Sequence, residues 1–135
     1  MSFKQLDEGK QKISTWLNNR IDKDAVQFSE DFGKYLAKNR FSKSQIRNIF
    51  SELKRIQMAG WNANQESDLL LMKPKLAYAA QRQSGRRAQN AAEDLKEILG
   101  QGIDQIVDSD NPEKCFENFV DFFEAILAYH KSFER

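Results

Sequence analysis

The sequence predicts an all-α protein, a compact bundle of five or six helices that forms a single domain over residues 1–135. Three observations support this prediction. Apolar side chains recur at helical spacing along the chain, and no stretch alternates with a period of two. Only two prolines and six glycines interrupt these patterns. A length of 135 residues, with 40% hydrophobic side chains and ten phenylalanines, is enough for one well-packed core.

The N-terminal half is expected to contain three helices. The first spans about residues 3–19. The second follows Asp24, a suitable N-cap with Gln27 three residues later. The third starts near Ser42 and ends at Gly60, because glycine is common directly after a helix. The apolar faces of these helices are formed by Leu6, Ile13, Trp16 and Leu17, by Phe28, Phe32, Tyr35 and Leu36, and by Ile46, Ile49, Phe50, Leu53 and Ile56.

The C-terminal half begins with the polar segment 61–66, which the sequence predicts to be a loop. A fourth helix lies within residues 69–83, where Pro74 either begins the helix or kinks it. Residues 83–87, with the sequence QSGRR, form the next break. A fifth helix is expected over residues 88–107, although its two glycines weaken it.

The last helix is expected to follow Asn111, with Pro112 in its first turn. Its apolar stripe, at positions i, i+3, i+4, i+7, i+10, i+11 and i+14, is formed by Phe116, Phe119, Val120, Phe123, Ile126, Leu127 and His130. Phe122, Tyr129 and Phe133 widen this stripe. We therefore expect this helix to be the most buried one.

The charges are distributed unevenly along the chain, although the formal net charge is only +1. Residues 34–87 carry twelve basic and three acidic side chains, a net charge of +9. Residues 1–33 carry five bases and six acids, a net charge of −1, and residues 88–135 carry four bases and eleven acids, a net charge of −7. The near-neutral total therefore hides a basic middle segment and an acidic C-terminal third.

Basic side chains in the middle segment have helical spacing. One row on the third helix has the spacing i, i+4, i+11, and a second row on the fourth has i, i+7, i+11. Together with one neighbouring arginine, they give seven candidate phosphate contacts: Lys43, Arg47, Lys54, Lys75, Arg82, Arg86 and Arg87. Such rows bind phosphate backbones because each cation neutralises a phosphate and releases counterions. The same rows are also compatible with an ordinary solvated face, and the basic and acidic blocks with head-to-tail stacking of identical subunits.

Groups suited to catalysis or metal binding are few, and we expect no enzyme, cofactor or metal site. The chain has one histidine, His130, which lies in an apolar stripe and is interpreted as a core residue. Its one cysteine, Cys115, is interpreted as a small buried side chain; a single thiol excludes an internal disulfide and suits the cytoplasm. No apolar stretch is long enough to cross a membrane, and the first residues lack the apolar core of a signal peptide.

Three blocks of sequence, in this order and spacing, point to a known family. They are SKSQIRNIFSELKRI at 42–56, LLLMKPKLAYAAQR at 69–82 and FENFVDFFEAILAYHKSF at 116–133. The chain, over about residues 25–133, resembles the small subunit of the type III-A CRISPR–Cas effector, the second protein of the Csm complex. Gln81 departs from the family pattern, which has a small residue before the arginine.

The resemblance implies a non-catalytic, all-helical subunit of an RNA-guided complex for antiviral defence. Several copies would stack beside the other effector subunits and hold the guide RNA and target RNA by their phosphate backbones, while base pairing reads the sequence. Arg47, Lys75 and Arg82 match basic positions of the family's motifs. The alternative that the residues leave open is a helical adaptor that binds protein subunits without touching RNA.

Overall fold

The computed structural model describes residues 3–134, and these form seven α-helices and no strand. The helices are α1 (Leu6–Asn18), α2 (Lys23–Lys38), α3 (Lys43–Met58), α4 (Ala63–Leu70), α5 (Met72–Gln81), α6 (Arg86–Asp108) and α7 (Pro112–Phe133). The predicted all-α bundle is therefore confirmed. The number of helices is larger than expected because the segment before α5 folds into a short helix of its own.

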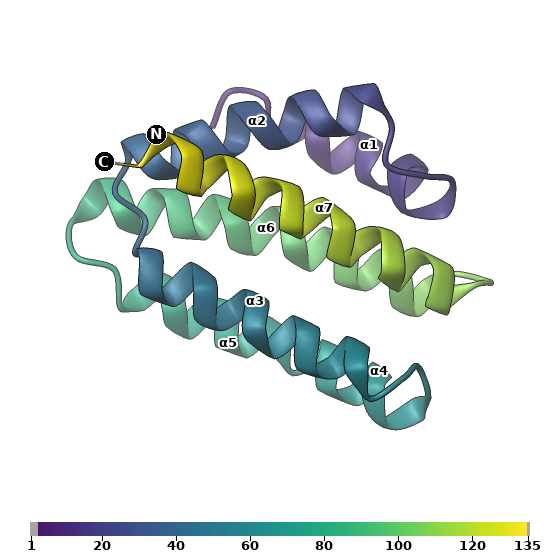
Figure 1. The fold of residues 1–135 in the computed structure, drawn as a ribbon. Helices are drawn as coiled ribbons and strands as arrows, with labels where there is room; N and C mark the ends of the chain where they lie inside the picture. The colour runs from purple at the N-terminus through teal and green to yellow at the C-terminus, as the bar shows by residue number, and fades with distance from the viewer. Residues whose placement is uncertain (1–2, 135) are drawn as a thin grey trace.

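Two long helices, α6 and α7, form the centre of the bundle (Figure 1). Helices α1 and α2 cover one side of this pair, and α3, α4 and α5 cover the other. The α2–α3 and α5–α6 turns lie at one end of the bundle, and the α6–α7 turn lies at the opposite end. No helix in residues 3–134 is long and apolar enough to cross a membrane.

Side-chain caps fix the starts of several helices. The Ser42 hydroxyl accepts a hydrogen bond from the backbone N–H of Gln45 at the start of α3, which begins where the sequence predicts. At α7, Asn111 is the cap and Pro112 is the first helical residue. The expected cap of α2 was wrong by two residues: Asp22, not Asp24, accepts from the N–H of Ala25, at 2.9 Å.

The segment 61–66, expected to be a loop, contains the start of α4. The Asn62 side chain accepts a hydrogen bond from the N–H of Asn64 and caps this short helix. Helix α4 ends at Leu70, and α5 begins at Met72 after a single linking residue. Pro74 is the third residue of α5, where its missing N–H has no helical acceptor to lose.

Helix α6 continues through both of its glycines without a break. At Gly102 the close packing requires glycine, because a Cβ there would lie 2.7 Å from the Phe119 ring of α7. The helix begins directly after Gly85, whose φ of +90° favours glycine. The central α6–α7 contact therefore depends on a residue that lowers the intrinsic helix propensity of α6.

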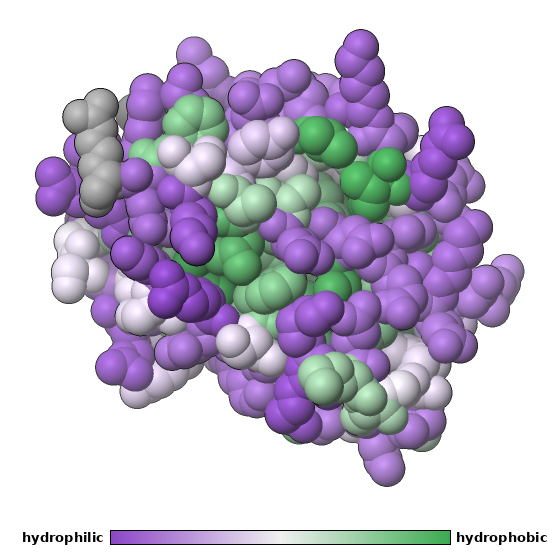
Figure 2. Space-filling view, viewed as in Figure 1, coloured by the Kyte–Doolittle hydropathy of each residue, from purple (hydrophilic) through white to green (hydrophobic). Residues whose placement is uncertain are grey.

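The core confirms the predicted apolar faces. Helix α7 contributes a row of fully buried aromatic and aliphatic side chains, including Phe119, Phe122 and Phe123. The predicted core residues that remain partly accessible are Tyr35, Phe50, Leu127, Tyr129 and Phe133. The face seen in Figure 2 is mostly hydrophilic, with hydrophobic side chains showing near its middle.

Candidate nucleic-acid interface

The predicted basic side chains lie on three surfaces of the bundle. The first is a hollow of about 270 Å³ between α3 and α5, which Lys75 and Arg82 line. The Arg82 guanidinium lies 5.5 Å from the centre of the Tyr78 ring, in a cation–π arrangement. Both side chains are exposed, so this pair presents a positive charge and an aromatic face to solvent.

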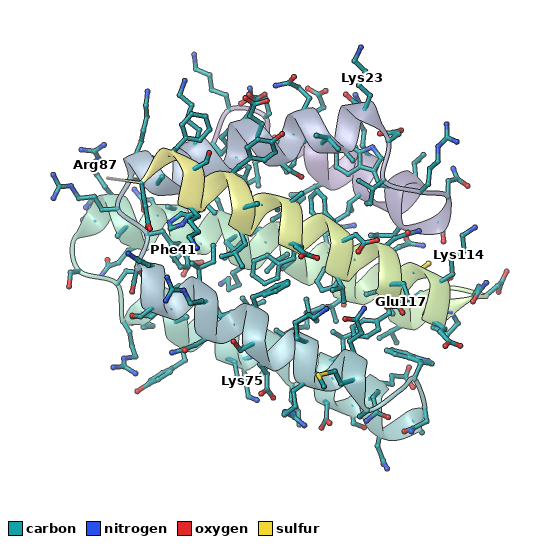
Figure 3. All side chains as sticks on the ribbon, in the orientation of Figure 1. Lys23, Phe41, Lys75, Arg87, Lys114 and Glu117 are labelled. Atoms are coloured by element: carbon teal, nitrogen blue, oxygen red, sulfur yellow. The ribbon has the colours of Figure 1, made fainter. Side chains whose placement is uncertain are left out.

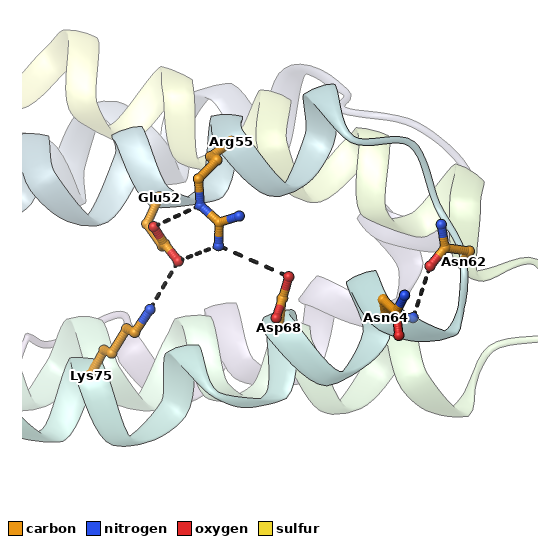
Figure 4. A network of polar contacts seen from close by, with 6 residues as sticks. All are labelled: Glu52, Arg55, Asn62, Asn64, Asp68 and Lys75. Atoms are coloured by element: carbon orange, nitrogen blue, oxygen red, sulfur yellow. Dashed lines mark hydrogen bonds and ion pairs between the residues drawn. The ribbon is translucent and has the colours of Figure 1, made fainter.

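Lys75 takes part in an ion-pair network around Glu52 (Figure 4). The Glu52 carboxylate accepts hydrogen bonds from Arg55 Nη2 at 2.7 Å and from Lys75 Nζ at 2.9 Å. The Arg55 and Lys75 hydrogen bonds lower the pKa of Glu52 to about 2. At neutral pH the Lys75 charge is therefore partly balanced within the chain, and a phosphate would compete with Glu52 for it.

The second surface is the side of α3 that faces α7. Lys43 Nζ lies 3.3 Å from a Glu134 carboxylate oxygen, and Arg47 lines a hollow of about 230 Å³ that Lys131 of α7 also lines. The Arg47 side chain is exposed and makes no ion pair or hydrogen bond within residues 3–134. Its charge is therefore available to a phosphate.

Lys54 lies further along this side of α3, in a more acidic setting. Its ammonium donates a hydrogen bond of 2.7 Å to Gln57 Oε1 and acts on the α7 carboxylate of Asp121. The pKa of Asp121 is raised mainly by burial and then by the neighbouring Glu124 and Glu117, and Lys54 partly offsets this effect. Half-buried and close to Asp121, Lys54 is the least accessible of the seven candidates to a phosphate.

The third surface is a groove of about 690 Å³ between α2, the start of α6 and residues 3–5. Arg87 donates to the backbone oxygen of Lys38 at 3.0 Å and to Asn39 Oδ1 at 3.3 Å, which fixes its guanidinium at the end of α2. Arg86 lines the same groove and is exposed, with no ion pair in the described part of the chain. Figure 3 shows Arg87 at the end of the bundle opposite Lys23 and Lys114.

The structure corrects one predicted row. Arg86 was expected to continue a row with Lys75 and Arg82, but α5 ends at Gln81 and Arg86 begins α6, so these three share no helix. Sequence reasoning also left out Lys34 and Lys38, which line the groove beside Arg86. Their i, i+4 spacing within the basic middle segment was the signal that could have found them.

The structure gives the histidine and the cysteine structural environments. His130 is buried, and its Nε2 lies 3.3 Å from the backbone oxygen of Phe41. Burial is the main cause that lowers the pKa of His130. The Cys115 thiol is buried and hydrogen-bonds to Asn18 Oδ1 and Ser109 Oγ, each at 3.1 Å. Residues 3–134 contain no group of three or more His, Cys, Asp or Glu side chains arranged to hold a metal ion.

Comparison with known proteins identifies the family. Neither a curated protein nor a solved structure matches the chain. The family described as Csm2 Type III-A matches residues 20–135. This range includes helices α2 to α7 and the three sequence blocks. The predicted resemblance is thus confirmed: the chain belongs to the Csm2 Type III-A family, the small subunit of the type III-A CRISPR effector complex.

Proposed function

We propose that this small subunit contacts the phosphate backbone of the guide and target RNA within the effector complex. It does so through basic side chains, without reading the sequence and without catalysing a reaction. Membership of the family gives assembly with the other Csm subunits. The RNA contact, the stacking of several copies and the role in antiviral defence are the proposal. The unpaired thiol suits a cytoplasmic complex.

One observation carries the proposal: most of the predicted cations are not neutralised within the chain. Of the seven candidates, only Lys43 and Lys75 form ion pairs with acids in residues 3–134. Arg47, Arg82 and Arg86 are exposed and form none there. An unpaired surface arginine carries a full charge with a fork of donors that fits phosphate oxygens. Several such groups would give the subunit a salt-sensitive affinity for RNA.

The distribution of charge along α6 supports stacking of several copies. This helix of 23 residues begins with Arg86 and Arg87 and ends with Asp108, so its two ends are about 34 Å apart. Asp110 of the α6–α7 turn and Glu113 in the first turn of α7 add to the acidic end. Opposite charges at opposite ends favour head-to-tail association of identical copies. In a stack, weak RNA contacts from each copy add up to a high overall affinity.

The test is to reverse two exposed charges and measure RNA binding by fluorescence anisotropy. In the full chain, Arg47→Glu with Arg82→Glu should weaken binding of labelled RNA by about tenfold or more at low salt. The matched control is Lys23→Glu with Lys114→Glu, which makes the same charge change at the opposite end of the bundle (Figure 3). Equal affinities of the two double variants would contradict the proposal.

The adaptor alternative is tested with the assembled complex. Its supporting observation is the acidic end, which offers a charged surface to protein partners. If the subunit contacts RNA, the Arg47→Glu, Arg82→Glu variant should co-purify with the other subunits and protect the RNA less well from nuclease. The adaptor would be favoured by two results together. The Arg47→Glu, Arg82→Glu variant would protect the RNA as well as the wild type does, and replacement of Asp108 and Asp110 by Lys would prevent assembly.

A further inference from the structure

A groove at the end of α2 combines a basic rim with an aromatic floor. It has a volume of about 690 Å³, within the range of about 300–1,000 Å³ that is typical of small-ligand sites. We propose that this groove is a binding site for a nucleoside phosphate, whose phosphate group meets the basic rim and whose base lies against the aromatic floor. If the bound nucleotide is part of an RNA, this site adds a further contact to the proposed RNA interface and rests on that proposal. If the ligand is a free nucleotide, the site is independent of it.

The rim is strongly positive. Its basic side chains come from the N-terminal segment, α2 and the start of α6: Lys4, Lys34, Lys38, Arg86 and Arg87. Asp31 is the only acidic residue that lines the groove within the described chain. The N–H groups at the start of α6 add to this field, because Gly85 provides no side-chain cap. This balance of charge selects an anionic ligand.

The floor contains two aromatic side chains held in place by one buried carboxylate. Asp94 of α6 is 2% exposed, and its Oδ2 accepts hydrogen bonds from the Tyr35 hydroxyl at 2.7 Å and from the Phe3 backbone N–H at 2.8 Å. The Phe3 and Tyr35 rings pack with their centres 5.1 Å apart. Through these two hydrogen bonds, Asp94 holds Phe3 and Tyr35 together at the groove.

Arg87 is also oriented before any ligand arrives. Its bonds to the Lys38 backbone oxygen and to Asn39 hold the guanidinium at the edge of the groove. A positioned cation next to an aromatic floor fits a ligand that carries a phosphate and a flat ring. Inorganic phosphate would use only the rim, and a purely apolar ligand would leave the net positive charge of the rim unbalanced. A nucleotide uses both parts of the groove.

The experiment is a set of NMR titrations of the full, isotope-labelled chain. The probes are AMP, a short single-stranded RNA, the same RNA with abasic sugars, and inorganic phosphate. We expect AMP and the RNA to shift amide signals of residues 3–5, 34–39 and 86–90. The abasic RNA should bind about five- to 150-fold more weakly than the intact RNA, because base stacking is lost.

Charge reversal locates the site. Lys34→Glu with Lys38→Glu should weaken AMP binding about tenfold or more, whereas the Lys23→Glu, Lys114→Glu control should not. If the affinity for AMP equals the affinity for the RNA, the ligand is a free nucleotide. If only the RNA binds tightly, the ligand is an unpaired nucleotide of RNA.

Two results would overturn the nucleotide site. One is that inorganic phosphate or abasic RNA binds as tightly as AMP or intact RNA. The other is that the Lys34, Lys38 variant binds AMP like the wild type. Failure of the general RNA contact is separate, because it is measured with the Arg47→Glu, Arg82→Glu variant, neither of whose positions lines this groove.

Discussion

Gly33 of α2 packs directly against the backbone of His130 in α7. A Cβ at position 33 would lie 2.8 Å from the His130 nitrogen and 2.9 Å from the Ile126 carbonyl oxygen. Because these are backbone atoms within a helix, they cannot move aside as a flexible side chain can. Gly33→Ala should therefore lower the free energy of unfolding by about 1–3 kcal/mol, measured by urea denaturation.

Gly100 of α6 is the matched control for this substitution. A Cβ there would be 3.7 Å from the Lys73 side chain, which is an ordinary contact. Gly100→Ala should raise the free energy of unfolding by about 0.5–1 kcal/mol, because alanine has the higher helix propensity. If both substitutions stabilise the protein, the close α2–α7 approach is not as described.

Arg40 adopts a left-handed backbone conformation, with a φ of 63°, at the end of α2. Its N–H donates to the carbonyl oxygen of Ala37, and the N–H of Phe41 donates to that of Leu36, the two bonds of a Schellman motif. Arg40→Gly should raise the free energy of unfolding by about 1 kcal/mol, because glycine adopts this conformation without strain. Thermal denaturation of both variants measures the change, and Arg40→Ala should give no such gain. An equal gain in stability for Arg40→Ala would show that backbone strain is not the cause.

The hydrogen bond from the Tyr35 hydroxyl to Asp94 should make the stability of the protein depend on pH in the alkaline range. Burial, followed by the hydrogen bond to Asp94, raises the pKa of Tyr35 above its ordinary value of 10.0. The folded state therefore prefers the protonated phenol, and this contribution to stability is present below pH 10 and lost as the pH rises further. Tyr35→Phe should cost about 1–3 kcal/mol at pH 7.

The free energy of unfolding of the wild type and of Tyr35→Phe, measured by urea denaturation between pH 8 and about 11, tests this pH dependence. The stability gap between wild type and Tyr35→Phe should narrow above pH 10. A gap that stays constant across this range would show that the Tyr35 proton is not coupled to folding.

Glu52 restrains Lys75, so removing the Glu52 charge should strengthen RNA binding. Glu52→Gln should raise the RNA affinity at low salt, and the slope of log affinity against log salt should steepen by up to about 0.7. Glu113→Gln, in the first turn of α7, is the control of equal charge. An equal gain in both variants would mean that net charge, and not Lys75, is responsible.

The same substitution tests the low pKa of Glu52. A pKa of about 2 in the folded state, below the ordinary 4.5, gives stability that is present above pH 4.5 and lost as the pH falls toward 2. The loss should be under about 1 kcal/mol, because Arg55 and Lys75 are exposed and screened by solvent. It should be absent in Glu52→Gln.

The helices were predictable where a strong apolar stripe or a clear cap existed. Helix α7 has a continuous stripe with Pro112 in its first turn, and both features were read from the sequence. Helix α4 was missed because only eight residues separate its cap from its end, and its first turn is polar. Short helices of this kind are stabilised by tertiary packing, which a local pattern does not reveal.

The candidate site was predictable as a basic segment and not as a surface. Helical spacing grouped Lys43, Arg47 and Lys54 correctly on the side of α3 that faces α7. It could not show that Lys54 lies close to Asp121 of that helix, or that Glu52 binds Lys75. The groove beside Arg86 was missed because it is built from residues 3–5, α2 and α6, which are brought together only by the fold.

The central claim is that Arg47 and Arg82 each contact an RNA phosphate, and the salt dependence of binding tests it most directly. The slope of log affinity against log salt should be measured for the wild type and for Arg47→Ala with Arg82→Ala, using single-stranded RNA. Loss of two contacts at about 0.7 each should make the slope shallower by about 1.4. Equal slopes for the two proteins would contradict the claim.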